Sequence, residues 1–97
     1  MQVIVLGSDC VVTKKYLELI KRRMKALRRN GFVVASMDGE VHRKYGIQNR
    51  CDPSMCPGCG FLFPMNGEYL PALVVNGVVE LHSLFPSEEE LDRVLLR

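Results

Sequence analysis

The sequence lacks the features that mark membrane, secreted and fibrous proteins. No apolar run approaches the roughly 18 residues of a membrane-spanning helix. Residues 1–7 lack the basic start and the long apolar core of a secretory signal. No repeat, linker or low-complexity tract interrupts the 97 residues, of which 47% are apolar and 25% charged. We therefore expect a cytoplasmic protein with one domain over residues 1–97 and no membrane partner.

The cysteines are too few for a small secreted scaffold that is held together by disulfides. The chain has four of them, and its apolar content is sufficient for a core that needs no such cross-links. Cytoplasmic thiols are normally kept reduced. We therefore expect the cysteines to serve as free thiols, as a metal site or as a redox pair.

The net charge of +2 conceals a difference between the two halves of the chain. Residues 1–50 carry eleven Lys and Arg against four Asp and Glu, whereas residues 51–97 carry two against seven, so the halves have charges of +7 and −5. Most of the cations lie opposite the apolar stripe of a predicted helix, where a solvated face is expected. We therefore do not expect a nucleic-acid partner, and a non-catalytic interaction module is only our third alternative.

The first 37 residues predict a strand, a helix and a second strand. Residues 3–6 form a short β-branched apolar run, which is typical of a strand buried on both faces. Apolar residues then recur at helical spacing over 12–29, at Val12, Tyr16, Ile20, Met24 and Leu27. Residues 32–37 repeat the strand pattern, so we expect a parallel pair joined by a right-handed helical crossover.

The ends of the predicted helices carry recognisable capping signals. Ser8 or Asp9 can cap the start of the long helix, and the Asn-Gly pair at 30–31 can supply the left-handed residue that ends it. Residues 38–45 predict a short helix that ends at Gly46. Near the end of the chain, Ser87 and Glu90 have the spacing of a capping box before a last short helix.

The second half of the chain predicts a long loop followed by a hairpin. Over about 48–69 neither a helical nor a strand period is sustained, and three of the four cysteines lie there. A loop of this length inside a small domain usually has a functional reason. The Asn76-Gly77 pair between the apolar runs 71–75 and 78–81 is a strong signal for a β-hairpin.

This order of elements resembles that of the thioredoxin-fold superfamily. Four segments resemble the small thioredoxin- and glutaredoxin-like proteins, at 6–10, 44–47, 70–77 and 86–91. The first segment resembles the strand-to-helix turn that carries the family's nucleophilic cysteine, here Cys10, and the third resembles the segment that begins with its cis-proline, here Pro71. The resemblance implies an α/β fold: a thioredoxin-like βαβ(α)-loop-ββα three-layer sandwich with a mixed four-stranded sheet.

Two departures from the family pattern concern the cysteines. The family signature is Cys-x-x-Cys, whereas here Thr13 stands three positions after Cys10, so a dithiol at the usual place is excluded. Gly46 and Pro71 are 25 positions apart, where the family has only a few residues. The chain therefore carries an insertion of about twenty residues, and that insertion contains Cys51, Cys56 and Cys59.

Our leading hypothesis is a thiol-disulfide redox protein. A cysteine at the first turn of a helix has a lowered pKa, because the thiolate faces unpaired backbone amides and the positive end of the helix dipole. Cys10 would be the catalytic nucleophile, and Cys56 and Cys59 would form or resolve disulfides. The resemblance implies that Pro71, with Leu70 and Thr13, binds the substrate. Protein disulfides, dithiols or glutathione would be the partners, and this reading requires no cofactor.

The alternative hypothesis is a metal-binding protein of the same fold. Two cysteines separated by two residues can bind one tetrahedral metal ion from a tight turn. Cys51, Cys56 and Cys59 have a spacing that plant-type ferredoxins also use, and Cys10 could be the fourth ligand of zinc or of an iron-sulfur cluster. His42 or His82 could complete a zinc site in place of Cys10, although we expect His42 to lie on a solvated surface.

Overall fold

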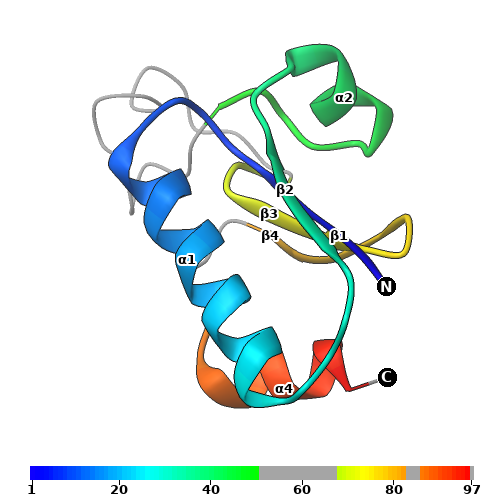
Figure 1. Ribbon diagram of the computed structural model, residues 1–97. Coiled ribbons are helices and arrows are strands. Elements are labelled where there is room, and N and C mark those ends of the chain that lie inside the picture. Colours follow the sequence, from blue (N-terminus) through cyan, green and yellow to red (C-terminus); the bar gives the residue numbers. More distant parts are fainter. Residues whose placement is uncertain (51–67, 83–85, 97) are drawn as a thin grey trace.

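The computed structural model describes residues 1–50, 68–82 and 86–96, and its centre is a mixed four-stranded sheet. The elements are β1 (Gln2–Leu6), α1 (Val11–Ala26), β2 (Phe32–Ser36), α2 (Gly39–Lys44), β3 (Ala72–Val75), β4 (Val78–His82) and α4 (Glu88–Leu95). The strands follow the order β2-β1-β3-β4 across the sheet (Figure 1). The expected α/β class and mixed four-stranded sheet are confirmed, and the arrangement is compatible with a thioredoxin-like fold.

The β1 strand lies inside the sheet and is covered on both faces. It pairs in parallel with β2 and antiparallel with β3. Val3 and Val5 are fully buried in one core cluster, whereas Leu6 is buried in a second cluster on the opposite face. The apolar run therefore forms the strand that the sequence predicts. Successive side chains of a strand point to opposite faces of the sheet, and each face is covered by one of the two core clusters.

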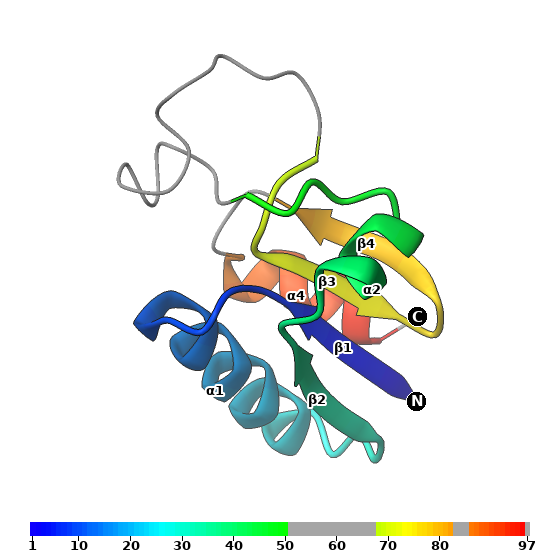
Figure 2. The ribbon, with the colours of Figure 1, turned by 90° about the horizontal axis from the view of Figure 1, so that it is seen from above.

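The larger core lies between the sheet and the helices α1 and α4. It contains Val3, Val5, Tyr16, Ile20, Met24, Leu73, Val75, Leu91, Val94 and Leu95. Figures 1 and 2 show α1 running along the sheet with α4 beside it. The predicted apolar stripe of α1 is confirmed by the burial of Tyr16, Ile20 and Met24. Within the described residues, no helix has both the length and the apolar character needed to cross a bilayer.

The smaller core lies on the opposite face of the sheet, beneath α2. Its buried members are Leu6, Ile47, Leu70, Ala72 and Val74, and Val41 and Tyr45 of the α2 region pack against them. The short helix is capped by Asp38, whose side chain accepts a hydrogen bond from the Glu40 amide at 2.9 Å. Gly46 follows the helix in a left-handed conformation with φ of 75°, so the predicted end of the helix at Gly46 is confirmed.

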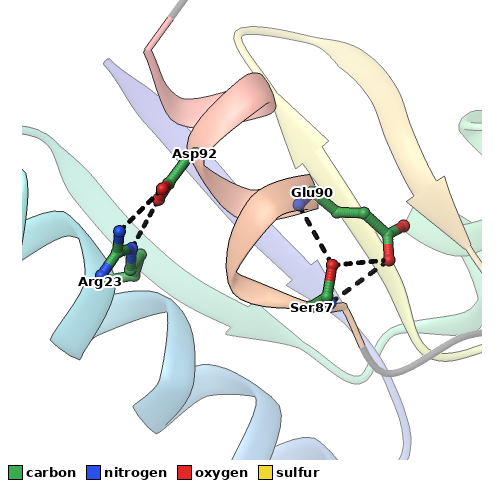
Figure 3. A network of polar contacts seen from close by, with 4 residues as sticks. All are labelled: Arg23, Ser87, Glu90 and Asp92. Atoms are coloured by element: carbon green, nitrogen blue, oxygen red, sulfur yellow. Dashed lines mark hydrogen bonds and ion pairs between the residues drawn. The ribbon is translucent and has the colours of Figure 1, made fainter.

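A polar contact joins α1 to α4 at the rim of the larger core. The Arg23 guanidinium donates two hydrogen bonds to the Asp92 carboxylate, at 2.6 and 2.8 Å (Figure 3). These hydrogen bonds lower the pKa of Asp92 and raise that of Arg23. The predicted capping box is also present, since the Ser87 hydroxyl accepts from the Glu90 amide at 3.2 Å and the Glu90 carboxylate accepts from the Ser87 amide at 3.3 Å.

The hairpin has the turn that its sequence predicts. Asn76 and Gly77 have φ values of 50° and 83°, as the central residues of a type I′ turn require. The Asn76 side chain also accepts a hydrogen bond from the Gln2 amide at 2.9 Å. The turn therefore fixes the β3–β4 pair and also the start of β1.

The end of α1 differs from the expectation. The helix stops at Ala26 rather than near residue 29, and Arg28 takes the left-handed conformation with φ of 55°. Neither Asn30 nor Gly31 has a positive φ, so the predicted stop at 30–31 is wrong. Gly31 is needed for another reason: Phe32 donates to the Met1 carbonyl at 3.0 Å, and a Cβ on Gly31 would collide with that carbonyl oxygen.

We predict that Arg28→Gly stabilises the protein by about 0.5–1 kcal/mol, because glycine adopts a left-handed backbone without the penalty that a side chain incurs. Chemical denaturation monitored by circular dichroism measures the change. Arg22→Gly is the matched control, since Arg22 is an exposed residue inside α1 and its replacement should cost about 1 kcal/mol. Equal losses in the two variants would contradict the prediction.

Candidate functional site

Cys10 stands at the N-terminal end of α1, and it is itself the N-cap residue. Its backbone is extended, with φ of −150° and ψ of 171°, and its carbonyl accepts from the Lys14 amide at 3.2 Å. The Cys10 amide donates to the Ser8 carbonyl at 2.8 Å, which forms the turn out of β1. The expectation that Ser8 or Asp9 caps the helix is therefore wrong, because the turn brings Cys10 into the cap position.

The sulfur of Cys10 lies beside the first turn of α1. Burial acts to raise the pKa of the thiol, and the carboxylate of Asp9 acts in the same direction. Hydrogen bonds from the Thr13 amide and hydroxyl and from the Val12 amide outweigh both effects, so the pKa lies below its ordinary value. The N-terminus of α1 therefore stabilises the thiolate form of Cys10, and this form is the nucleophile in thiol chemistry.

Thr13 holds the sulfur from the first turn of the helix. Its side chain is 2% exposed, and its Oγ1 lies 3.7 Å from the Cys10 Sγ. Gly7 makes room for this arrangement, since a Cβ on Gly7 would lie 2.7 Å from the Thr13 Cγ2 and closer still to Oγ1. Thr13, three positions after Cys10, is thus a hydrogen-bonding partner of that cysteine.

Pro71 directly precedes β3. It lies at the end of the sheet where β1 leads into the turn at residues 8–10, which we call the Cys10 turn. Leu6 pairs with Ala72, so one further step of the antiparallel register sets Pro71 opposite Gly7. The Leu70-Pro71 peptide bond is cis, and both residues are buried. The Leu70 amide donates to the Arg50 carbonyl at 2.8 Å. Pro71 and Leu70 therefore lie at the same end of the sheet as Cys10 and Thr13.

The chain closes on itself at the base of the cysteine-rich insertion. We define the loop base as residues 48–50 and 68–70, where the Gln48 amide donates to the Glu68 carbonyl at 2.8 Å in addition to the Leu70–Arg50 bond. The two described stretches that flank residues 51–67 thus lie side by side. Cys51, Cys56 and Cys59 belong to that segment and lie outside the described residues. The predicted meeting of four sulfurs is therefore untested.

His42 is buried, contrary to our expectation of a solvated surface residue. It is 0% exposed; its Nε2 donates to the Ser36 carbonyl at 2.9 Å, and its Nδ1 lies 2.9 Å from the side-chain amide of Asn49. Both ring nitrogens are engaged in these contacts, so the described structure gives His42 no nitrogen for a metal. Its role is to tie α2 and the entry to the loop base to the end of β2.

The signal for this role lies in the spacing around His42. Residue 42 follows Asp38 by one helical turn, and Asn49 approaches so closely that a Cβ on Gly39 would lie 2.6 Å from its Nδ2. A glycine at the start of a short helix weakens the helix locally, so Gly39 could have indicated a close neighbour.

His82, the last residue of β4, lies next to the loop base. Its Nε2 is 3.8 Å from the Glu68 carboxylate, so β4 contacts the returning chain. In residues 1–50, 68–82 and 86–96, no three His, Cys, Asp or Glu side chains gather in a way that could hold a metal. A hollow of about 410 Å³ adjoins the loop base and is lined by Arg43, Gly46, Ile47, Gln48, Asn49 and Arg50. Arg43 and Arg50 give this lining positive charge.

Comparisons with models of known protein families, with curated proteins and with solved structures found no match to this chain. The chemistry assigned to the chain therefore depends on the geometry around Cys10 and on the loop base.

We predict that Thr13→Val raises the pKa of the Cys10 thiol, because the variant keeps the shape of the side chain but loses the hydroxyl hydrogen bond. The measurement is the pH dependence of alkylation, in a background where Cys51, Cys56 and Cys59 are replaced by serine. Thr13→Ser is the matched control and should leave the pKa unchanged, since it retains the hydroxyl. If both variants titrated like the parent, the hydroxyl would have no influence on the thiolate.

Proposed function

We propose that the chain is a thiol-disulfide redox protein in which Cys10 is the nucleophile. The observation that carries the proposal is the position of Cys10 as the N-cap of α1, where hydrogen bonds from Thr13 and Val12 lower the pKa of its thiol. A thiolate near neutral pH attacks disulfides far faster than a thiol does. The site is only partly buried, so a disulfide can approach the sulfur.

The exchange reaction proceeds in two steps. The Cys10 thiolate attacks one sulfur of a substrate disulfide, the substrate S–S bond breaks, and its other sulfur leaves as a thiolate that takes a proton from water. Cys56 or Cys59 then attacks the Cys10 sulfur as a thiolate, which forms a disulfide within the chain and releases the second substrate thiol. The substrate is reduced and the chain oxidised, and an external dithiol or glutathione restores the two protein thiols.

The loop base supports a resolving role for the insertion. The Arg50 carbonyl accepts a hydrogen bond from the Leu70 amide. Pro71 follows Leu70 and lies opposite Gly7 when the β1–β3 register is continued by one residue. Successive Cα atoms are about 3.8 Å apart, so the insertion begins only a few residues from the Cys10 turn. Its Cys-x-x-Cys pair is typical of a disulfide with a tunable potential.

The same geometry favours substrates with an extended backbone or with negative charge. Pro71 would lie beside an extended peptide at this end of the sheet, and Leu70 would contribute its carbonyl, because its amide already donates to the Arg50 carbonyl. The arginines of the hollow at the loop base suit the carboxylates of glutathione. We propose the cytoplasm as the setting, since reduced free thiols persist there.

We expect Cys10→Ser to lower the rate of disulfide exchange by about 100-fold or more, because it removes the nucleophile. The probe is oxidised glutathione with dithiothreitol as the final reductant, and rapid quenching with mass spectrometry records the mixed disulfide on Cys10. Cys51→Ser is the matched control and should keep the parent rate, since Cys51 has no part in the two steps. An unchanged rate in Cys10→Ser would refute the redox proposal.

A second candidate is a metal site in which Cys10, Cys51, Cys56 and Cys59 bind zinc or an iron-sulfur cluster. The hydrogen bonds of the loop base favour it, because they bring the two ends of the insertion together near the Cys10 turn. Four thiolates and no surplus cysteine suit a closed tetrahedral site.

The metal proposal predicts about one zinc ion, or a visible iron-sulfur absorption band, per chain after anaerobic purification. Elemental analysis and absorption spectroscopy provide the measurement, and Cys51→Ser should reduce the metal content. A folded, colourless and metal-free protein would eliminate this candidate. The variant also separates the two proposals, because redox exchange survives the loss of Cys51 and a four-thiolate site does not.

A further inference from the structure

The two edges of the sheet are built differently. The edge strand β4 carries Glu80 and His82, and an irregularity interrupts its register with β3 between Leu73 and Val74. Such charges and bulges protect an edge from pairing with other strands. The edge strand β2 has none of them: Phe32–Ser36 contains no charge and no proline, and it pairs with β1 in unbroken register. The β2 edge is therefore open to a further strand.

Within the described residues, the backbone of β2 presents unpaired N–H and C=O groups on its outer side. The Phe32 amide donates to the Met1 carbonyl at 3.0 Å, and the Ser36 carbonyl accepts from the Gly7 amide at 3.1 Å. The backbone N–H and C=O groups of Phe32 and Ser36 therefore point towards β1. Alternate residues of a strand direct their N–H and C=O groups to opposite sides. Val33 and Ala35 therefore direct theirs outward, and no strand in the described part of the chain lies beyond them (Figure 2).

Apolar side chains accompany this edge. Phe32 is 78% exposed and Val34 is 47% exposed. Val33 packs against the larger core, so Phe32 and Val34 point to the opposite face, which α2 covers near Leu6 and Ala72 rather than over the start of β2 (Figure 1). Exposed apolar side chains beside an unprotected strand edge mark an interaction surface.

We propose that β2 pairs antiparallel with β2 of a second copy of this chain, so that two sheets become one. The outward groups of Val33 exchange two hydrogen bonds with Ala35 of the second copy, and symmetry provides two more. Val34 then lies opposite Val34 of the second copy as a close non-hydrogen-bonded pair, with Phe32 opposite Ser36. The apolar side chains that each copy exposes are covered by the other.

The charges on either side of β2 favour a second copy over an unrelated peptide. Arg28 and Arg29 precede the strand, whereas Asp38 and Glu40 follow it. An antiparallel two-fold pairing brings the basic end of one strand to the acidic end of the other, and a parallel pairing would bring like charges together. The strand and its flanks are thus complementary to themselves in one orientation only.

The test is sedimentation velocity under reducing conditions over a range of protein concentrations. We expect the mass to rise from the 11.0 kDa of one chain to twice that value. Val34→Lys should raise the dissociation constant at least about tenfold, because two lysines would face each other across the pair. Val34→Glu should also raise the dissociation constant, because two glutamates would then face each other across the pair. Mixing the two variants should restore dimers, since the introduced lysine of one copy then faces the introduced glutamate of the other.

Val78→Lys is the matched control on the other edge, because Val78 is 57% exposed in β4 and should tolerate the change without loss of dimer. Circular dichroism confirms that each variant is folded. A chain that stays at 11.0 kDa up to millimolar concentration would overturn the proposal. So would a dimer that Val34→Lys leaves intact, or a mixture of the lysine and glutamate variants that stays monomeric.

Discussion

The hydrogen bonding of β1 to strands on both sides is the constraint on which the rest of the structure depends. Its parallel pairing with β2 requires a helical crossover, which places α1 against the larger core. Its antiparallel pairing with β3 fixes the end of the sheet at which Pro71 enters. Because Leu6 is the last residue of β1 and pairs with both Ser36 and Ala72, three chain segments meet beside the Cys10 turn.

The chemistry at that turn is a balance between burial and hydrogen bonding. Partial burial disfavours the thiolate of Cys10, and Asp9 adds a repulsive charge. The amides of the first helical turn and the Thr13 hydroxyl act against both, and they prevail. Thr13 can do this only because Gly7 has no side chain. The absence of a side chain at Gly7 is therefore a requirement of the site.

Strong local patterns in the sequence were sufficient to predict the strands and helices of the described residues, whereas the mixed four-stranded sheet was expected from the resemblance to the thioredoxin-fold superfamily. The apolar runs gave every strand, and the Asn76-Gly77 turn and the Ser87–Glu90 capping box formed as predicted. Features that depend on contacts between distant residues were missed. Gly31 resembled a helix stop, but it is needed for the approach of Met1.

The same limit applies to the candidate site. Cys10 was predicted at the start of α1, but which residue caps the helix depends on the turn from Ser8 and not on capping preference. His42 was predicted to be solvated because Arg43 and Lys44 adjoin it, yet Ser36 and Asn49 provide partners for both of its ring nitrogens. Neither partner is a helical neighbour of His42, so helical periodicity could not have indicated the burial, and Gly39 was the one local sign of a close neighbour.

The proposed pairing of β2 has a consequence for the proposed chemistry. Ser36, at the end of β2, is bonded to Gly7, so the Cys10 turn belongs to the C-terminal end of that strand. In an antiparallel pair, the C-terminal ends of the two β2 strands point in opposite directions. A five-residue strand is about 17 Å long, so the two Cys10 sulfurs are too far apart for a disulfide, which needs Cα atoms within about 7 Å. The dimer would therefore carry two separate thiol sites, one towards each end of the paired β2 strands.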